Sequence, residues 1–171
     1  MSALFLDECV SVLTRTPGTL AALLRDLPEA WTAATEGPDT WSPYVVIGHL
    51  VHNEKINWMP HLTMILEHGP GRPFDSLDRE AQFRDSASQS LSTLLDEFSA
   101  LRRDNLARLR ALNLQPAQLE LKGTHPALGP VTARRLLATW TAHDLAHLLQ
   151  VSRTMAKRYP QEVGPGQNIC R

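Results

Sequence analysis

Apolar residues recur every three or four positions through most of the chain, and no segment alternates apolar and polar residues as a half-buried strand would. This spacing predicts an all-α protein. The predicted helices cover residues 4–27, 43–67, 86–112 and 132–159. At 1.5 Å per residue each would be about 35 to 43 Å long, which is typical of a four-helix bundle.

Turn-forming residues divide these patterns. Thr16-Pro17-Gly18 lies inside the first helix and predicts a kink or a short break there. Ser42 and Pro43 supply an N-cap and a first-turn proline for the second helix. The connection of about 17 residues between the second and third helices is longer than a tight hairpin needs, so it allows a long crossover. Residues 113–130 are rich in Gly and Pro and are expected to be irregular.

Composition is that of one soluble domain. The chain has 171 residues, of which 43% are hydrophobic and 20% are charged, and this is enough to bury a core without disulfides or structural metals. We expect a single four-helix-bundle domain over residues 1–160 and a flexible C-terminal tail over residues 161–171. No internal repeat or low-complexity segment interrupts this organisation.

Charge and cysteine content limit the classes of partner and the cellular compartment that can be expected. Seventeen basic and eighteen acidic residues give a net charge of -1, and no Lys/Arg block forms a basic face, which argues against nucleic acid. The apolar runs are short, and acids come early in MSALFLDECVSV, which argues against a membrane span and a signal peptide. Cys9 and Cys170 are too few for a disulfide framework or a thiolate metal site. We therefore expect a cytoplasmic protein that acts on a small molecule.

Three histidines carry the candidate chemistry. His143 and His147 lie four residues apart in TWTAHDLAHLLQ, so both occupy one helix face, at the border of its apolar stripe. His49, in VVIGHLVHNEKINW, faces inward from the second helix. An HxxxH pair alone is weak, but three buried imidazoles need compensation, and a divalent metal would satisfy all three. Neutral imidazole suits Zn, Ni, Fe or Mn, and three protein ligands leave positions open for catalysis.

The neighbours of these histidines have several readings. His52 could be a spare ligand, an acid/base group or a surface residue, and the pocket rim or the surface is favoured. Asn53 lies one turn after His49 on the same face and is a candidate contact for the ligands or the substrate. Asp144 could accept the outer N–H of a ligand such as His49, or it could face solvent or cap the helix. Trp140 could wall the pocket, although a core position is slightly favoured.

Several motifs together resemble the DinB-like superfamily, and the resemblance extends in order from the first helix to Tyr159. They are Trp41-Ser42-Pro43, Gly48-His49-Leu50 with Asn53-Glu54, the loop His125 to Thr132, and His143-Asp-Leu-Ala-His147. The resemblance implies a four-helix bundle with a long crossover between helices two and three. It also implies a divalent metal held by His49, His143 and His147. Characterised relatives of this kind include transferases of low-molecular-weight thiols, such as bacillithiol and mycothiol, and isomerases that use a thiol cofactor.

Two functions follow from these expectations. The first is a metal-dependent enzyme, a thiol S-transferase or a related hydrolase, in which the metal activates a low-molecular-weight thiol or water to attack an electrophilic small molecule. The second is a non-catalytic metal-binding or stress-associated bundle protein. A homodimer through exposed apolar residues of helix one or three fits either function. The sequence identifies neither the metal nor the substrate.

Overall fold

The structure, a computed structural model, describes residues 2–75, 78, 80–159 and 162. The elements in order are α1 (Ser2–Leu24), α2 (Glu29–Thr32), α3 (Pro43–Ile56), α4 (Trp58–His68), the 3-10 helix η1 (Gly69–Gly71), α5 (Ala81–Ser86), α6 (Leu91–Ala111), α7 (Pro116–Leu119), β1 (Lys122–His125), β2 (Gly129–Thr132) and α8 (Ala133–Ala156). The sequence predicts a flexible tail over residues 161–171. Only Glu162 of this segment is among the described residues, so the prediction lies outside them.

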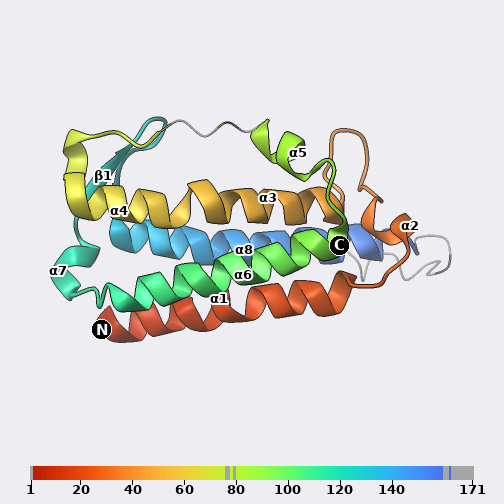
Figure 1. The fold of residues 1–171 in the computed structure, drawn as a ribbon, viewed down its shortest axis with the longest axis horizontal. Helices are drawn as coiled ribbons and strands as arrows, with labels where there is room; N and C mark the ends of the chain where they lie inside the picture. Colours follow the sequence, from red (N-terminus) through yellow and green to blue (C-terminus); the bar gives the residue numbers. More distant parts are fainter. Residues whose placement is uncertain (1, 76–77, 79, 160–161, 163–171) are drawn as a thin grey trace.

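Four long helical segments form the bundle: α1, α3 with α4, α6, and α8 (Figure 1). In this view α1 and α8 run in one direction, while α3–α4 and α6 run in the other. Because α4 and α6 are consecutive long helices with the same direction, the chain must return along the whole bundle between them. That crossover carries η1 and α5, and α5 packs against α3. The predicted all-α four-helix bundle with a long crossover is confirmed.

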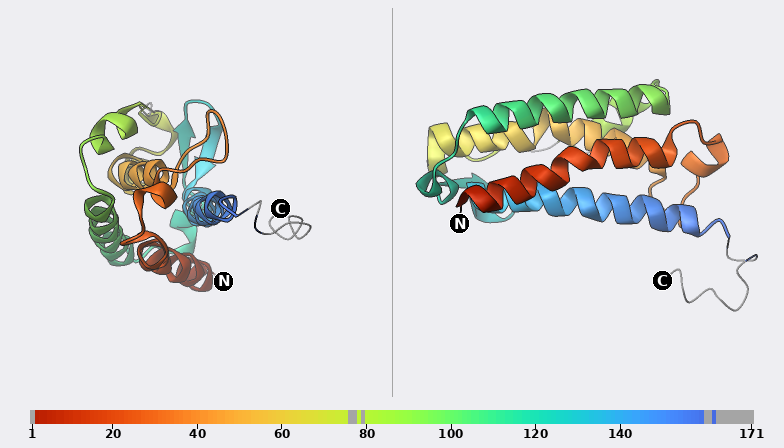
Figure 2. Two further views of the ribbon diagram at one scale, coloured as in Figure 1. Left: turned by 90° about the vertical axis from the view of Figure 1, so that its right-hand side faces the viewer. Right: turned by 90° about the horizontal axis from the view of Figure 1, so that it is seen from below.

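Seen end-on, the four segments stand at the corners of a square, with α1 next to α6 and α8 (Figure 2). Their apolar faces form two buried clusters along the bundle axis. One includes Leu62 and Trp140, and the other includes Ile47 and Phe98. No helix in the described part of the chain is long and apolar enough to cross a membrane.

The sequence predicts a kink or a short break at Thr16–Gly18, and helix α1 runs through Pro17 without interruption, so the break is wrong. A proline inside a helix has no N–H for the carbonyl four residues earlier, here that of Leu13. That carbonyl instead accepts a hydrogen bond from Nη1 of Arg102, on α6, at 2.8 Å. The tertiary contact replaces the missing helical bond, and local sequence gives no sign of it.

The second and third helices differ from their predicted bounds. The second is divided at Asn57 into α3 and α4. The third begins at Leu91 rather than Ser86, because the side chain of Ser90 accepts the backbone N–H of Thr93 and caps α6. Ser86 instead ends α5, the short helix that the polar crossover forms against α3.

Residues 113–130 are not irregular as expected. They form α7 and most of a two-stranded antiparallel hairpin, in which Lys122 pairs with Thr132 and His125 with Gly129. The crossover is attached to this hairpin, since the Phe74 N–H donates to the Thr124 carbonyl at 2.8 Å. Gly129, with a φ of 72°, takes the left-handed conformation that the turn requires. The strands are too short to show a period in the sequence.

Candidate metal centre

The bundle brings His49, His143 and His147 together. His49 extends from α3, while His143 and His147 extend from successive turns of α8. Nε2 of His143 lies 3.0 Å from Nε2 of His49 and 3.2 Å from Nε2 of His147. One nitrogen from each ring lies within 4.8 Å of the other two, and no other such cluster of His, Cys, Asp or Glu occurs among the residues that were placed.

Two glutamines fix the tautomers of the outer rings. Oε1 of Gln82, on α5, lies 2.5 Å from Nδ1 of His49, and Oε1 of Gln150 lies 2.8 Å from Nδ1 of His147. An amide oxygen only accepts, so both histidines carry their proton on Nδ1. Their Nε2 atoms are therefore bare lone pairs, and both are directed at Nε2 of His143.

The three Nε2 atoms lack the protons needed to satisfy one another. His143 can supply at most one proton to this gap, so at most one of its two close contacts can be a full hydrogen bond, and the Nε2 lone pair of the other ring receives no proton from this cluster. A metal bound at about 2.0–2.1 Å to each nitrogen would place them roughly 2.9 Å apart in octahedral geometry and 3.4 Å apart in tetrahedral geometry. The observed separations of 3.0 and 3.2 Å fall within that range. The residues present therefore fit a divalent metal ion.

Burial keeps these imidazoles neutral. It lowers the pKa of His49 to about 4 and the pKa of His143 to about 3, with the neighbouring histidines adding to the effect. Burial also lowers the pKa of His147, against a hydrogen bond to Gln150 that opposes the shift. Neutral imidazole is the form that binds metals, so the centre is prepared for ligation at neutral pH without losing protons.

A cavity of about 490 Å³ opens beside His49. It is lined by Trp41, His49, His52, Asn53, Asp78, Glu80, Gln82 and Phe83. The Trp41 ring lies 4.9 Å from the His49 ring and stacks parallel to His147 at 6.3 Å. The cavity therefore has aromatic walls, carboxylates among its lining residues and the histidine cluster at one side, and it could admit a small molecule.

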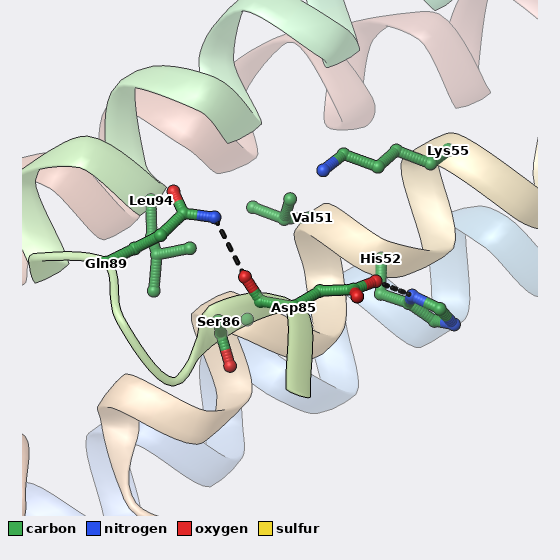
Figure 3. A pocket seen from close by; sticks show the side chains of 8 residues that line it. Val51, His52, Lys55, Asp85, Ser86, Gln89 and Leu94 are labelled. Carbon is green, nitrogen blue, oxygen red and sulfur yellow. Dashed lines mark hydrogen bonds and ion pairs between the residues drawn. The ribbon is translucent and has the colours of Figure 1, made fainter. Parts of the chain in front are cut away.

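His52 and Asn53 both line this cavity. His52 is 8% exposed, and neither of its ring nitrogens has a hydrogen-bond partner among the described residues. Its Nδ1 lies 3.4 Å from Oδ2 of Asp85 on α5, beside a small hollow between α3 and α5 (Figure 3). It is outside the three-histidine cluster, which argues against a spare ligand, and it is buried, so the surface reading is wrong. Its place in the cavity lining agrees with the pocket-rim reading. Asn53 Nδ2 donates to the His49 carbonyl at 2.9 Å and lies 3.2 Å from the His49 ring nitrogens.

Asp144 and Trp140 occupy the core rather than the pocket. Asp144 is fully buried in the middle of α8 and binds Arg102, so none of its expected roles is correct: it does not contact the outer nitrogen of His49, face solvent or cap the helix. Trp140 is 1% exposed, donates from Nε1 to Glu54 at 3.1 Å and stacks on Trp58. The core reading of Trp140 is therefore the correct one.

Sequence reasoning did not find Gln82, Gln150 or Arg102. Gln82 lies in the polar crossover, where no periodicity indicates which side chain turns inward. Arg102 did leave a signal, because it stands four residues after Phe98 and in register with the apolar positions of its helix. Asp144 left a similar one, at about 80° on the α8 wheel and so inside the apolar stripe. Because Arg102 and Asp144 have opposite charges and both stand at core positions of their helices, the sequence could have predicted that they form an ion pair.

These features define a class of protein: a four-helix bundle with a long crossover between α4 and α6 and a cluster of three histidines. The family model of the DinB superfamily matches residues 13–151, and the chain belongs to that superfamily. No protein of curated function matches the sequence.

Solved structures of other proteins are similar in fold, and two of them carry the comparison. One is that of YfiT from Bacillus subtilis, described as a probable metal-dependent hydrolase with an unusual four-helix bundle topology. It has a TM-score of 0.78 and 18% identity over 90% of this chain and 87% of that chain. The other is TT2238, described as a four-helix bundle protein, with a TM-score of 0.53 and 21% identity over 86% of this chain and 98% of that chain.

Proposed function

We propose that this protein is a divalent-metal-dependent enzyme that transfers a low-molecular-weight thiol to an electrophilic small molecule. The observation that carries the proposal is the convergence of three Nε2 atoms, two of them held as lone pairs by glutamines, beside an open cavity. His49, His143 and His147 would hold the ion, with Zn, Ni, Fe and Mn as the candidates. The description of YfiT as a probable metal-dependent hydrolase is consistent with metal chemistry in this fold.

A bound ion would lower the pKa of a thiol or water in an open position and so supply a nucleophile near neutral pH. The chain's own residues do the remaining work. Gln82 and Gln150 keep the ligand rings in one tautomer and orientation. His52 lines the cavity, neither of its ring nitrogens has a hydrogen-bond partner in the part of the chain that the structure describes, and Asp85 lies beside Nδ1, so we assign to His52 the uptake of the nucleophile's proton. Trp41 and Phe83 pack edge to face and give the cavity an apolar wall.

The cavity lining supports an external nucleophile. Among the described residues of its lining there is no Cys, Ser, Thr or Lys, and the groups there that could attack a substrate are histidines and the carboxylates of Asp78 and Glu80. Cys9 is buried on α1, outside this lining, and burial raises the pKa of its thiol, which makes it a poor nucleophile. The proposal takes the nucleophile from solution, as a thiol or a water molecule, and these two choices correspond to S-transfer and hydrolysis.

The test is a turnover screen with protein loaded separately with Zn, Ni, Fe and Mn. Low-molecular-weight thiols are offered with model electrophiles such as haloaromatics, epoxides and activated alkenes, and activated esters and amides serve as hydrolysis substrates. The proposal predicts thiol-dependent turnover that is lost in His147→Ala and kept in His68→Ala, an exposed histidine at the end of α4. Turnover only without thiol would make the protein a hydrolase. No metal-dependent turnover at all would favour the non-catalytic binding protein.

A further inference from the structure

A buried charged cluster joins all four long segments of the bundle. Arg102 on α6 lies between Glu54 on α3, Asp144 on α8 and the carbonyl of Leu13 on α1. The three charged residues are 1%, 2% and 0% exposed, respectively. Charged groups are almost never buried this completely unless they are paired, so the cluster needs a physical account.

All five N–H groups of Arg102 are used. Nε and Nη2 donate to Oε1 of Glu54 at 3.1 and 2.8 Å. Nη1 and Nη2 donate to the two oxygens of Asp144 at 2.5 and 3.0 Å, and the remaining hydrogen of Nη1 binds the Leu13 carbonyl at 2.8 Å. Pro17 leaves that carbonyl free of a helical partner. The arginine therefore fixes the rotation of α8 about its axis relative to the other three segments.

The cluster carries excess negative charge. Oε1 of Glu54 accepts from Arg102 and from Nε1 of Trp140, and Oε2 accepts from Nδ2 of Asn105 at 2.9 Å. Both oxygens of Asp144 accept from Arg102. Since these partners are all donors, both acids are carboxylates. Two carboxylates against one guanidinium leave a net charge of -1 in the core.

The cluster is next to the metal centre along α8 and through packed rings. Asp144 directly follows His143 in the chain. Trp140, bound to Glu54, stacks on Trp58 at 5.7 Å, and the Trp58 ring meets the His143 ring edge-on at 5.1 Å. Any rotation of α8 that broke the Arg102–Asp144 pair would also move His143 away from His49.

We infer that Glu54, Arg102 and Asp144 are positioning residues of the metal centre, which set the orientation of α8 and supply the negative charge that a bound divalent cation requires. Three neutral imidazoles bring no charge to offset the two positive charges of such an ion. A buried ionic cluster is also a poor way to gain stability, because apolar replacements of the same volume are often as stable or more so. The inference rests on the metal site of the proposed function.

The test measures Zn²⁺ affinity by chelator competition and the visible spectrum of the Co²⁺ form, in Asp144→Asn and Glu54→Gln. Both substitutions keep the side-chain shape and remove one negative charge. The control is Leu109→Ala, a fully buried position of the α6 core outside the cluster, which lowers stability without touching these residues. Folding of each variant is verified by circular dichroism.

Both charge variants should bind Zn²⁺ about 10- to 100-fold more weakly, and Asp144→Asn should also alter the Co²⁺ bands, as expected for groups that orient metal ligands. Leu109→Ala should bind as the wild type does. Affinity within twofold of the wild type in either folded charge variant would overturn the inference while leaving the metal site intact. An equal loss in Leu109→Ala would also overturn it. A wild type without Zn²⁺ binding would overturn the proposed function itself, which is a different result.

Discussion

Replacing Arg102 by Met should cost more stability than almost any other single change in this chain. Methionine keeps an unbranched stem of similar length but removes five hydrogen-bond donors and the only positive charge of the cluster. Asp144 would then be buried without a partner, Glu54 would keep only its neutral donors Trp140 and Asn105, and the Leu13 carbonyl would be unsatisfied. Removing one partner of a buried ion pair costs about 3–5 kcal/mol. That is a large part of the roughly 5–15 kcal/mol that stabilises a typical domain.

Urea unfolding in EDTA measures this effect without a metal contribution. A chain of this size should lose roughly 2–4 °C of melting temperature for each kcal/mol, so a shift of about 6–20 °C is expected in a thermal scan. Arg103→Met is the matched control, because the adjacent Arg103 is exposed and its one ion pair among the described residues is with exposed Asp104. It should change stability by less than about 0.5 kcal/mol. Adding Glu54→Gln and Asp144→Asn to Arg102→Met should recover part of the loss. An Arg102→Met protein within about 1 kcal/mol of the wild type would refute the reasoning.

Three further predictions concern the site. In EDTA, the free energy of unfolding should fall as the pH drops from about 6.5 towards 4, because the pKa of His49 is lowered in the folded state and the unfolded chain therefore binds a proton at higher pH. His49 alone should contribute about 3 kcal/mol to this fall. An equally steep fall in His49→Gln would contradict this prediction. Gln82→Ala should weaken Zn²⁺ binding about 10- to 100-fold in chelator competition, since the His49 ring loses its acceptor; unchanged affinity would exclude that role. Gly48→Ala should cost about 1–3 kcal/mol in urea unfolding, because the added Cβ would lie 2.9 Å from Cβ and Oγ of Ser86, and a neutral effect would show that α5 is free to move.

The periodicity of apolar residues was sufficient to predict the four long helical segments, because each buries one continuous stripe. It could not predict how α1 continues through Pro17, since the missing hydrogen bond is replaced by Arg102, which is 85 positions further along. It also missed the hairpin, whose strands of four residues are too short to show a period. These errors share one cause: tertiary contacts decided the local structure.

The candidate site divides in the same way. Inward orientation and i, i+4 spacing were enough to bring His49, His143 and His147 together in prediction, since the helix geometry alone decides where those side chains point. The hydrogen-bond partners of these rings could not be predicted from the sequence. Gln82 comes from a crossover whose path the sequence does not specify. The prediction for Asp144 was wrong because its partner, Arg102, lies on α6, and no local pattern in the sequence links these two residues.

Elemental analysis of tag-free protein tests the central claim most directly. The wild type, His49→Ala, His147→Ala and the control His68→Ala are purified, incubated in turn with Zn, Ni and Mn, and freed of loosely bound metal. The account predicts about one divalent ion per chain in the wild type and in His68→Ala, and none in the folded variants of His49 and His147. No bound ion in the wild type, or full occupancy in the His49 and His147 variants, would contradict it.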